Sequence, residues 1–254
     1  MIEPRHTAKV YRQEPIADGI YSMWIKTPAA SVAREGQFIN VYMEDGAHIL
    51  PRPISICEVK EKAGLLRIVY RIAGKGTKAF SKLHAGDDID VFGPIGNGFP
   101  EVNGKVLLFG GGIGIPPMLF AAQKYKKNAT SVLGFRNETF LLSDFGLTRG
   151  HIFVATEDGS SGVKGTVIDA IADAEVEADV IFACGPLPML RAIKSYAKEH
   201  GIPAYVSMEE RMACGVGACL GCVTKTVSVD EHSHVNNARV CKDGPVFFAE
   251  EVEL

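Results

Sequence analysis

The chain has 254 residues, which is long for one domain and suits two or three. Its 46% hydrophobic and 22% charged residues are typical of a globular protein that is soluble in water. The formal net charge of −3 gives no basic excess, which argues against a nucleic-acid partner, and no apolar run is long enough to span a membrane. No targeting segment is evident, so we expect a cytoplasmic protein.

The first hundred residues contain short apolar runs separated by Gly and Pro. The runs are rich in β-branched and aromatic residues, which favour strands. The predicted strands are Ile20–Lys26, Gln37–Met43, Ile54–Val59 and Leu65–Ile72. This pattern is typical of a small antiparallel barrel, so we predict a β-barrel domain over residues 1–100.

From about residue 101, apolar strands alternate with helices. The predicted strands are Val106–Phe109, Ser131–Phe135, Ile152–Ala155 and Val180–Ala183. The predicted helices are Met118–Lys126, Val167–Asp173 and Leu187–Glu199. This alternation indicates a parallel α/β sheet, which we assign to residues 101–203. Residues 204–254 are too short to fold alone, and we expect a bound metal to supply much of their folding energy. The expected fold is multidomain, α/β plus β.

Four cysteines in that last segment have a distinctive spacing. They are Cys214, Cys219, Cys222 and Cys241, in the pattern C-x4-C-x2-C followed after 18 residues by the fourth. This is the ligand spacing of a plant-type [2Fe–2S] cluster, which carries one electron at a time. Three glycines, Gly215, Gly217 and Gly221, lie in the same loop. Because glycine has no Cβ, the backbone can wrap closely and turn its N–H groups toward sulfur.

Other uses of these cysteines fit less well. Structural zinc prefers two separated C-x2-4-C pairs, whereas three of these cysteines share one loop. Disulfides belong to secreted proteins, and a chain of this size does not need them. His232 and His234, between the third and fourth cysteines, do not have the spacing of a Rieske centre and are predicted to lie on a surface loop.

A glycine-rich turn connects a predicted strand to a predicted helix. Residues 110–118 read Gly-Gly-Gly-Ile-Gly-Ile-Pro-Pro-Met. Glycines let a dinucleotide pyrophosphate approach the backbone, and the helix N-terminus supplies free N–H groups. The pattern is G-x-G-x-x-P rather than G-x-G-x-x-G, so a tight turn without a ligand is the alternative.

Two further motifs each allow two interpretations. Arg52-Pro53-Ile54-Ser55 and the turn from Gly74 to Thr77 suit a flavin, because Arg can hold a diphosphate and Ser can hydrogen-bond the ring. The alternative interpretation is that Arg52 is a surface charge and that residues 74–77 form a hairpin turn.

Cys184 also allows two interpretations. It ends a predicted strand at the sheet edge where α/β proteins bind ligands, but it could equally be a core cysteine, the role predicted for Cys57.

The motifs follow one another in a characteristic order: R-P-x-S, G-x-G-T, G-x-G-x-x-P, C-G-P-x-x-M and then the cysteine quartet. This order resembles the ferredoxin–NADP reductase superfamily. Within it, the appended cysteine loop resembles the electron-transfer subunits of class B dihydroorotate dehydrogenases. The resemblance covers nearly the whole chain. It implies an FAD-binding barrel, a nicotinamide-binding α/β domain and a [2Fe–2S] segment.

The resemblance also implies roles for individual residues. FAD would be contacted by Arg52, Pro53, Ile54 and Ser55, lined by Val69, Tyr70 and Arg71, and held at its diphosphate by Gly76 and Thr77. The NAD pyrophosphate would lie on Gly110, Gly111, Gly112 and Gly114, and Cys184 would face the nicotinamide near the hydride path. Most of the superfamily ends in an aromatic residue that covers the flavin. This chain continues instead, so the residue that covers the flavin is not indicated.

The implied partner is an FMN-containing catalytic subunit that oxidises dihydroorotate to orotate in pyrimidine biosynthesis, in a heterotetramer with two copies of each subunit. Electrons would pass through [2Fe–2S] and FAD to NAD⁺. The chain is too short to include the βα barrel that such a catalytic subunit needs. The alternatives are the reductase subunit of an oxygenase, hydrogenase or NADPH–ferredoxin enzyme, and a zinc-bound interaction module without enzymatic activity.

The sequence leaves open the choice between NAD and NADP and the residues that contact the partner. Arg136 could receive the 2′-phosphate of NADP, whereas Glu138 could receive a ribose hydroxyl of NAD, which the resemblance favours. The partner is expected to dock around residues 214–222. There Met208, Met212 and Val216 are either apolar contacts with the partner or packing beneath the cysteine loop.

Overall fold

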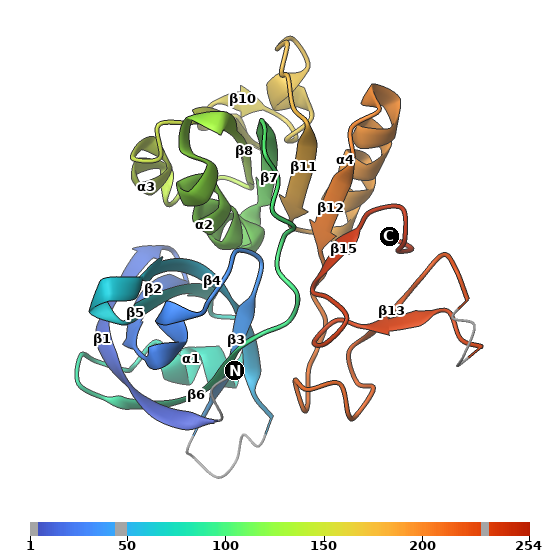
Figure 1. Cartoon of the computed structure of the whole chain (residues 1–254). Helices are drawn as coiled ribbons and strands as arrows, with labels where there is room; N and C mark the ends of the chain where they lie inside the picture. Colours follow the sequence, from blue (N-terminus) through green and yellow to red (C-terminus); the bar gives the residue numbers. More distant parts are fainter. Residues whose placement is uncertain (1–4, 44–49, 230–233) are drawn as a thin grey trace.

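The computed structural model describes residues 5–43, 50–229 and 234–254. His232 therefore lies outside the described residues. Figure 1 shows a β-barrel in blue and cyan, a helix-covered sheet in green to orange, and an orange-red segment beside both. Within the described residues no helix is long and apolar enough to cross a membrane.

The barrel closes in the strand order β1-β2-β5-β4-β3-β6, with antiparallel neighbours throughout. Its strands are β1 (His6–Ala17), β2 (Ile20–Lys26), β3 (Phe38–Tyr42), β4 (Arg52–Lys60), β5 (Leu65–Arg71) and β6 (Asp88–Ile95). Helix α1 (Lys75–Phe80) and the 3₁₀ turns Pro28–Ser31 and Glu61–Ala63 connect them. Because strand residues alternate between faces, residues such as Ile39, Val41 and Ile68 fill the barrel interior.

The second sheet has seven strands in the order β10-β9-β8-β7-β11-β12-β15. They are β7 (Val106–Gly111), β8 (Ala129–Phe135), β9 (His151–Thr156), β10 (Val163–Lys164), β11 (Val180–Cys184), β12 (Ala204–Ser207) and β15 (Val246–Phe248). All neighbours are parallel except β12 and β15. The helices are α2 (Ile115–Tyr125), α3 (Leu142–Gly146) and α4 (Leu187–His200), with 3₁₀ turns at Gly112–Gly114, Lys126–Asn128 and Asp169–Ile171.

The two faces of this sheet are covered differently. Leu108 packs with α2 on the face that meets the barrel, where Cys57 and Val69 join the same apolar cluster. Leu107 and Phe109 pack with α4 on the opposite face. Helix α2 therefore lies between the sheet and the barrel (Figure 1), which brings the start of that helix close to the outer wall of the barrel.

The C-terminal segment leaves the sheet edge and returns to it. After β12 comes the cysteine loop, then β13 (Val223–Lys225) pairs with β14 (Asn237–Arg239), and finally β15 returns antiparallel to β12. Ser207 lies opposite Val246, so the excursion begins and ends at neighbouring residues. The predicted domain boundary after residue 203 stays a prediction. Strands β12 and β15 lie beyond that boundary in the sequence but belong to the seven-stranded sheet.

The predicted fold class is confirmed, with an antiparallel barrel followed by a mainly parallel sheet. The four predicted barrel strands match β2 to β5 to within a few residues, whereas β1 and β6 were not predicted. The predicted helix Val167–Asp173 is only a 3₁₀ turn at Asp169–Ile171. There the Asp169 carboxylate accepts the Thr166 N–H at 2.7 Å, which caps the N-terminal end of the turn.

One buried cation ties the barrel to the α/β domain. Arg67 on β5 donates to Ser22 (2.8 Å), to Glu58 (3.2 Å) and to Asp144 on α3 (2.6 Å), and its side chain is 8% exposed. Asp144 is the one of these partners that lies in the second domain. A guanidinium shielded from water depends on these acceptors, so this network orients the two domains.

We expect Arg67→Ala to lower the free energy of unfolding by about 3 kcal/mol, because it leaves two carboxylates without their cation in a partly buried site. Chemical denaturation monitored by circular dichroism measures this change. Arg12→Ala is the matched control: Arg12 bonds Glu14 at 2.6 Å on the surface, and its loss should cost less than about 0.5 kcal/mol. Equal losses for the two variants would contradict the proposed role of Arg67.

Candidate redox site

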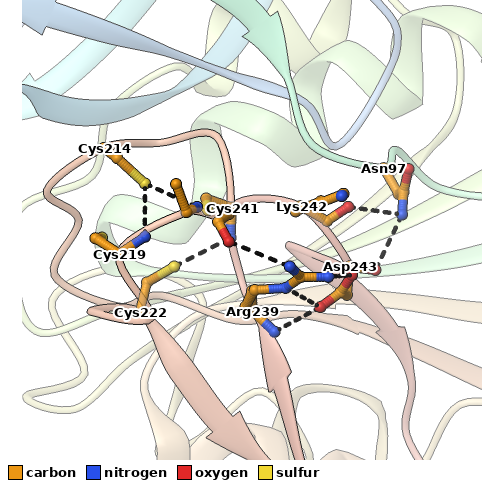
Figure 2. A network of polar contacts seen from close by, with 10 residues as sticks. Asn97, Cys214, Cys219, Cys222, Arg239, Cys241, Lys242 and Asp243 are labelled. Atoms are coloured by element: carbon orange, nitrogen blue, oxygen red, sulfur yellow. Dashed lines mark hydrogen bonds and ion pairs between the residues drawn. The ribbon is translucent and has the colours of Figure 1, made fainter. Parts of the chain in front are cut away.

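The cysteine loop places its four thiols at different depths. Cys222 and Cys241 are buried, Cys214 is half-buried and Cys219 is exposed. Val240, just before the fourth cysteine, donates its N–H to the Cys222 carbonyl at 2.9 Å. Figure 2 shows Cys214 beside Cys219 and Cys222 beside Cys241. The loop thus holds the thiols as two adjacent pairs.

Backbone N–H groups converge on the sulfur atoms of this loop. The Cys214 sulfur accepts N–H groups from Val216 (3.5 Å), Ala218 (3.3 Å) and Cys219 (3.4 Å). Gly221 donates to the Cys219 sulfur, and Cys241 donates to the Cys222 sulfur, each at 3.4 Å. These donors stabilise negative charge on sulfur, the form in which cysteine binds metals.

The thiol pKa values follow from these surroundings. Burial raises the pKa of Cys214, but the surrounding N–H groups outweigh it and lower that pKa to about 6. Burial, reinforced by the neighbouring Cys222, raises the pKa of Cys241 to about 12. A thiol of that kind ionises readily only when a cation compensates the charge, so the buried pair is suited to a metal.

The donor set therefore fits a [2Fe–2S] cluster held by Cys214, Cys219, Cys222 and Cys241. In the ranges 5–43, 50–229 and 234–254, no three His, Cys, Asp or Glu side chains already form a compact ligand group. The assignment of all four thiols to one cluster stays a prediction. Two glycines, Gly215 at φ +69° and Gly217 at φ +81°, give the loop the left-handed conformations that it needs.

A polar clamp behind the loop was not predicted from the sequence. Arg239 donates to the Asp243 carboxylate at 2.9 and 3.0 Å and to the Gly217 carbonyl at 3.1 Å. Asn97, from the chain that follows the barrel, donates to the carbonyls of Lys242 (3.2 Å) and Asp243 (3.0 Å) (Figure 2). The opposite charges of Arg239 and Asp243, close in sequence on either side of Cys241, were the available sequence signal.

The predicted flavin motif lies on β4 and in the first turn of α1. An added Cβ at Gly76 would collide with the Arg52 guanidinium, so the two positions are in direct contact. Arg52 also donates to the Leu50 carbonyl at 2.6 Å. The Thr77 hydroxyl accepts the Ala73 N–H at 2.9 Å and so fixes the turn itself. The Arg52 guanidinium and the first turn of α1 therefore lie side by side, as the binding of a diphosphate by both would require.

The strand β5 divides its three predicted flavin residues between two faces. Val69 packs outside the barrel with the α2 cluster, and Arg71 is exposed on the same side. Tyr70 points into the barrel, where its hydroxyl donates to the Gln13 side chain at 2.7 Å. Strand alternation requires this, so Tyr70 could reach a flavin outside the barrel only through its backbone.

The glycine turn meets the other candidate residues at the carboxyl end of the sheet. Cβ atoms added at Gly111 or Gly114 would collide with Met189 and with the Cys184 backbone, respectively. Gly112 has φ +52°, and a Cβ there would lie 3.9 Å from an Arg71 side-chain nitrogen. The end of β5 and the glycine turn are therefore neighbours. Binding of FAD and NAD next to each other would require this arrangement.

Cys184 lies opposite Gly110 in the β7–β11 register and is half-buried. Burial raises the pKa of the Cys184 thiol to about 12, so the thiol is neutral at physiological pH. Burial likewise raises the pKa of Cys57, which packs between β4 and α2 as predicted. A neutral Cys184 can contact a nicotinamide ring but is not an ionised nucleophile.

Residues 209–253 match the family model for the iron-sulfur cluster binding domain of dihydroorotate dehydrogenase B. The chain is 41% identical over 248 residues to the dihydroorotate dehydrogenase B (NAD(+)) electron transfer subunit of Caldanaerobacter subterraneus subsp. tengcongensis, covering 96% of this chain and 97% of the relative. This chain belongs to that family of electron transfer subunits. The Streptococcus pneumoniae R6 member of the family is also 41% identical, with 95% of each chain covered.

Solved structures agree with the fold of this family. The structure of an NADH-dependent reduced ferredoxin-NADP oxidoreductase, studied for flavin-based electron bifurcation, matches with TM-score 0.86 and 32% identity. It covers 97% of this chain and 89% of that one. A ferredoxin NADP+ reductase from Neisseria gonorrhoeae with bound FAD and NADP matches with TM-score 0.64 and 15% identity, over 78% of this chain and 92% of that one, which shows a shared fold alone.

The contact between Gly76 and Arg52 can be tested against a neighbouring glycine. We expect Gly76→Ala to weaken FAD binding at least tenfold, because the new methyl group displaces the guanidinium. Gly74→Ala is the control, since a Cβ at Gly74 would meet nothing within 4 Å and its φ is extended. Flavin fluorescence titration of the apoprotein gives both affinities. Equal FAD affinities of the Gly76→Ala and Gly74→Ala variants would contradict a role for Arg52 in FAD binding.

Proposed function

We propose that this chain is the electron-transfer subunit that passes electrons between an FMN-containing catalytic subunit, which oxidises dihydroorotate to orotate, and NAD⁺. One observation supports this most strongly. Cys222 and Cys241 share a single apolar cluster with Phe38 of the barrel and Phe109 of the sheet. The three segments that would carry [2Fe–2S], FAD and NAD thus meet in one core.

The residues have distinct tasks in this proposal. The Arg52 guanidinium neutralises the FAD diphosphate, and Ser55 presents a hydroxyl to the flavin ring. Gly110–Gly114 and the start of α2 offer backbone N–H groups to the NAD pyrophosphate. Cys184 contacts the nicotinamide as a neutral thiol. Bound FAD exchanges either one or two electrons, which joins hydride chemistry at NAD to one-electron transfer through [2Fe–2S].

The preference for NAD belongs to this proposal. Glu138 uses one carboxylate oxygen to accept the Asp18 N–H at 2.9 Å, and its other oxygen is available for a ribose hydroxyl. Arg136 lies 4.0 Å from Glu157, an exposed pair that would compete with a 2′-phosphate. We further propose the cytoplasm as the site of action and a heterotetramer with two copies of each subunit.

Fewer residues are available to contact the catalytic subunit than the sequence suggested. Met208 and Met212 are both 7% exposed and pack in the core beneath the cysteine loop, so they cannot be surface contacts. Val216 and Leu220 are exposed on the loop itself. Apolar side chains next to the exposed Cys219 would exclude water from the path that electrons take between subunits.

A visible spectrum of the anaerobically purified chain tests the central proposal. We expect flavin and iron–sulfur bands that NADH bleaches together, along with NADH-dependent reduction of an artificial dye. Cys222→Ser should remove the iron–sulfur bands but keep the flavin, whereas Cys57→Ala should keep both. A colourless protein that contains zinc would contradict the proposal and favour a non-enzymatic module.

The partner surface has its own test. We expect Leu220→Asp to weaken binding of the catalytic subunit about tenfold or more, because a charge replaces an apolar side chain at the centre of the interface. The control is Leu147→Asp at the C-terminal end of α3, where Leu147 is 83% exposed. Calorimetric titration against the purified catalytic subunit compares the two. Equal affinities would place the interface elsewhere.

The structural match to a ferredoxin-NADP oxidoreductase favours one competing function, a reductase subunit of another redox complex. The two functions differ in the electron donor. Reconstitution with a dihydroorotate-oxidising subunit should yield dihydroorotate-dependent reduction of NAD⁺. Reduction by ferredoxin alone would favour the competing function.

A further inference from the structure

One exposed cation of the barrel faces the glycine turn of the other domain. Arg71 ends β5, and strand alternation places it on the same outer face as Val69, which packs in the α2 cluster. The turn Gly112–Gly114 lies next to β5. A Cβ added at Gly112 would lie 3.9 Å from an Arg71 side-chain nitrogen. The guanidinium therefore extends across the domain boundary toward the turn.

Arg71 has no counter-ion among the residues that the structure describes. Within those residues its side chain forms no ion pair and no hydrogen bond, and it is exposed to solvent. Arg67 on the same strand is different, because it is buried and bonded to Glu58 and Asp144. The charge of Arg71 is thus available to an anionic ligand that lies between the barrel and the glycine turn.

The helix after the glycine turn has few N–H groups to offer. Pro116 and Pro117 occupy the first turn of α2 and carry no N–H. The N–H of Ile115 is already in use, because it donates to the Gly112 carbonyl. The helix dipole still favours an anion here, but several of the donors that usually hold a phosphate at such a place are missing. A diphosphate at this turn therefore gains from a charged side chain supplied by another element.

The space between Gly112 and Arg71 suits a phosphate chain. Gly112 is left-handed with φ +52°, whereas Gly114 and Ile115 are right-handed. A backbone that changes hand in this way can turn its N–H groups toward one centre and bind an anion. Because Gly112 has no side chain, the anion can lie against the turn while the guanidinium covers its other side.

We propose that the Arg71 guanidinium binds the pyrophosphate of NAD from the barrel side, opposite the glycine turn. This inference rests on the proposed function, which assigns NAD to Gly110–Gly114. It gives the Arg71 side chain a different ligand from the flavin that the sequence resemblance implied. A guanidinium can donate to two phosphate oxygens at once, so a residue of the flavin-binding domain fixes the dinucleotide across the domain boundary.

Arg71→Gln tests this contact in the full-length chain with FAD and the cluster bound, because glutamine stays polar but has no charge. We expect NAD⁺ to bind about tenfold more weakly in a calorimetric titration. ADP-ribose, which has the same diphosphate without the nicotinamide, should lose as much affinity. The FAD affinity of the apoprotein should not change. Unchanged NAD⁺ affinity would overturn the proposal, and an equal loss of FAD affinity would assign Arg71 to the flavin instead.

Two further measurements separate a direct contact from a structural role. Arg71→Lys keeps the positive charge, so its NAD⁺ affinity should lie between those of the wild type and Arg71→Gln. Salt screens exposed charges, so NAD⁺ affinity should fall more steeply with added NaCl in the wild type than in Arg71→Gln. Arg12→Gln is the control, since Arg12 pairs with Glu14 on the surface and should not affect NAD⁺. Parallel salt dependences of the wild type and Arg71→Gln would contradict the contact.

Two left-handed glycines of the α/β domain supply a matched pair. Gly112 has φ +52° and Gly201 has φ +65°, so alanine at either position carries similar backbone strain. The methyl group at Gly112 would occupy the space in front of Arg71, whereas at Gly201 it would meet no described residue within 4 Å. We expect only Gly112→Ala to weaken the binding of NAD⁺ and ADP-ribose. Equal affinities of the two variants would contradict the proposed position of the pyrophosphate.

The same titrations distinguish a failure of this inference from a failure of the proposed function. If the wild-type chain binds neither NAD⁺ nor ADP-ribose, the proposed nicotinamide site fails. If the wild type binds both and Arg71→Gln binds them equally well, the role of Arg71 alone is overturned.

Discussion

The pairing of Ser207 with Val246 closes the C-terminal segment onto the edge of the sheet. The intervening chain therefore leaves and returns at one place on the sheet edge. Met208 and Met212 fill the base of that loop, and Phe38 of the barrel packs against the same core. The cysteines are held between two domains because this single strand pair fixes both ends of the segment.

This closure explains how a short, glycine-containing loop can hold a defined shape. The Arg239–Asp243 pair and the Asn97 side chain support the loop from behind. The N–H groups that face the Cys214 sulfur are then directed by a rigid frame. A site that must change charge without changing shape benefits from such support, because small reorganisation favours rapid electron transfer.

The features that could be predicted from the sequence were those that depend on nearby residues. The strands β2 to β5 are dense in β-branched and aromatic residues, and the cysteine spacing is local. Strand β1 alternates only weakly, with many polar residues on its exposed face, so periodicity did not reveal it. The inward direction of Tyr70 follows from side-chain alternation along β5, which is itself a local pattern of the sequence.

The support that Asn97 gives the cysteine loop could not be predicted, for another reason. Asn97 follows the barrel, and its partners are the backbone carbonyls of Lys242 and Asp243, which are distant along the chain. A backbone carbonyl has no sequence signature, so only the folded chain reveals this contact. The Arg239–Asp243 pair is closer in sequence, but two opposite charges in a loop do not by themselves predict an ion pair.

The apolar cluster that joins Phe38, Phe109 and Cys241 has a further consequence. Residues from all three segments contribute to it, so none of the segments can lose its packing without exposing the others. The protein should therefore melt in one cooperative transition despite its multidomain architecture. Damage to the cysteine loop by oxygen would then be transmitted as a loss of stability to the nicotinamide-binding and flavin-binding segments as well.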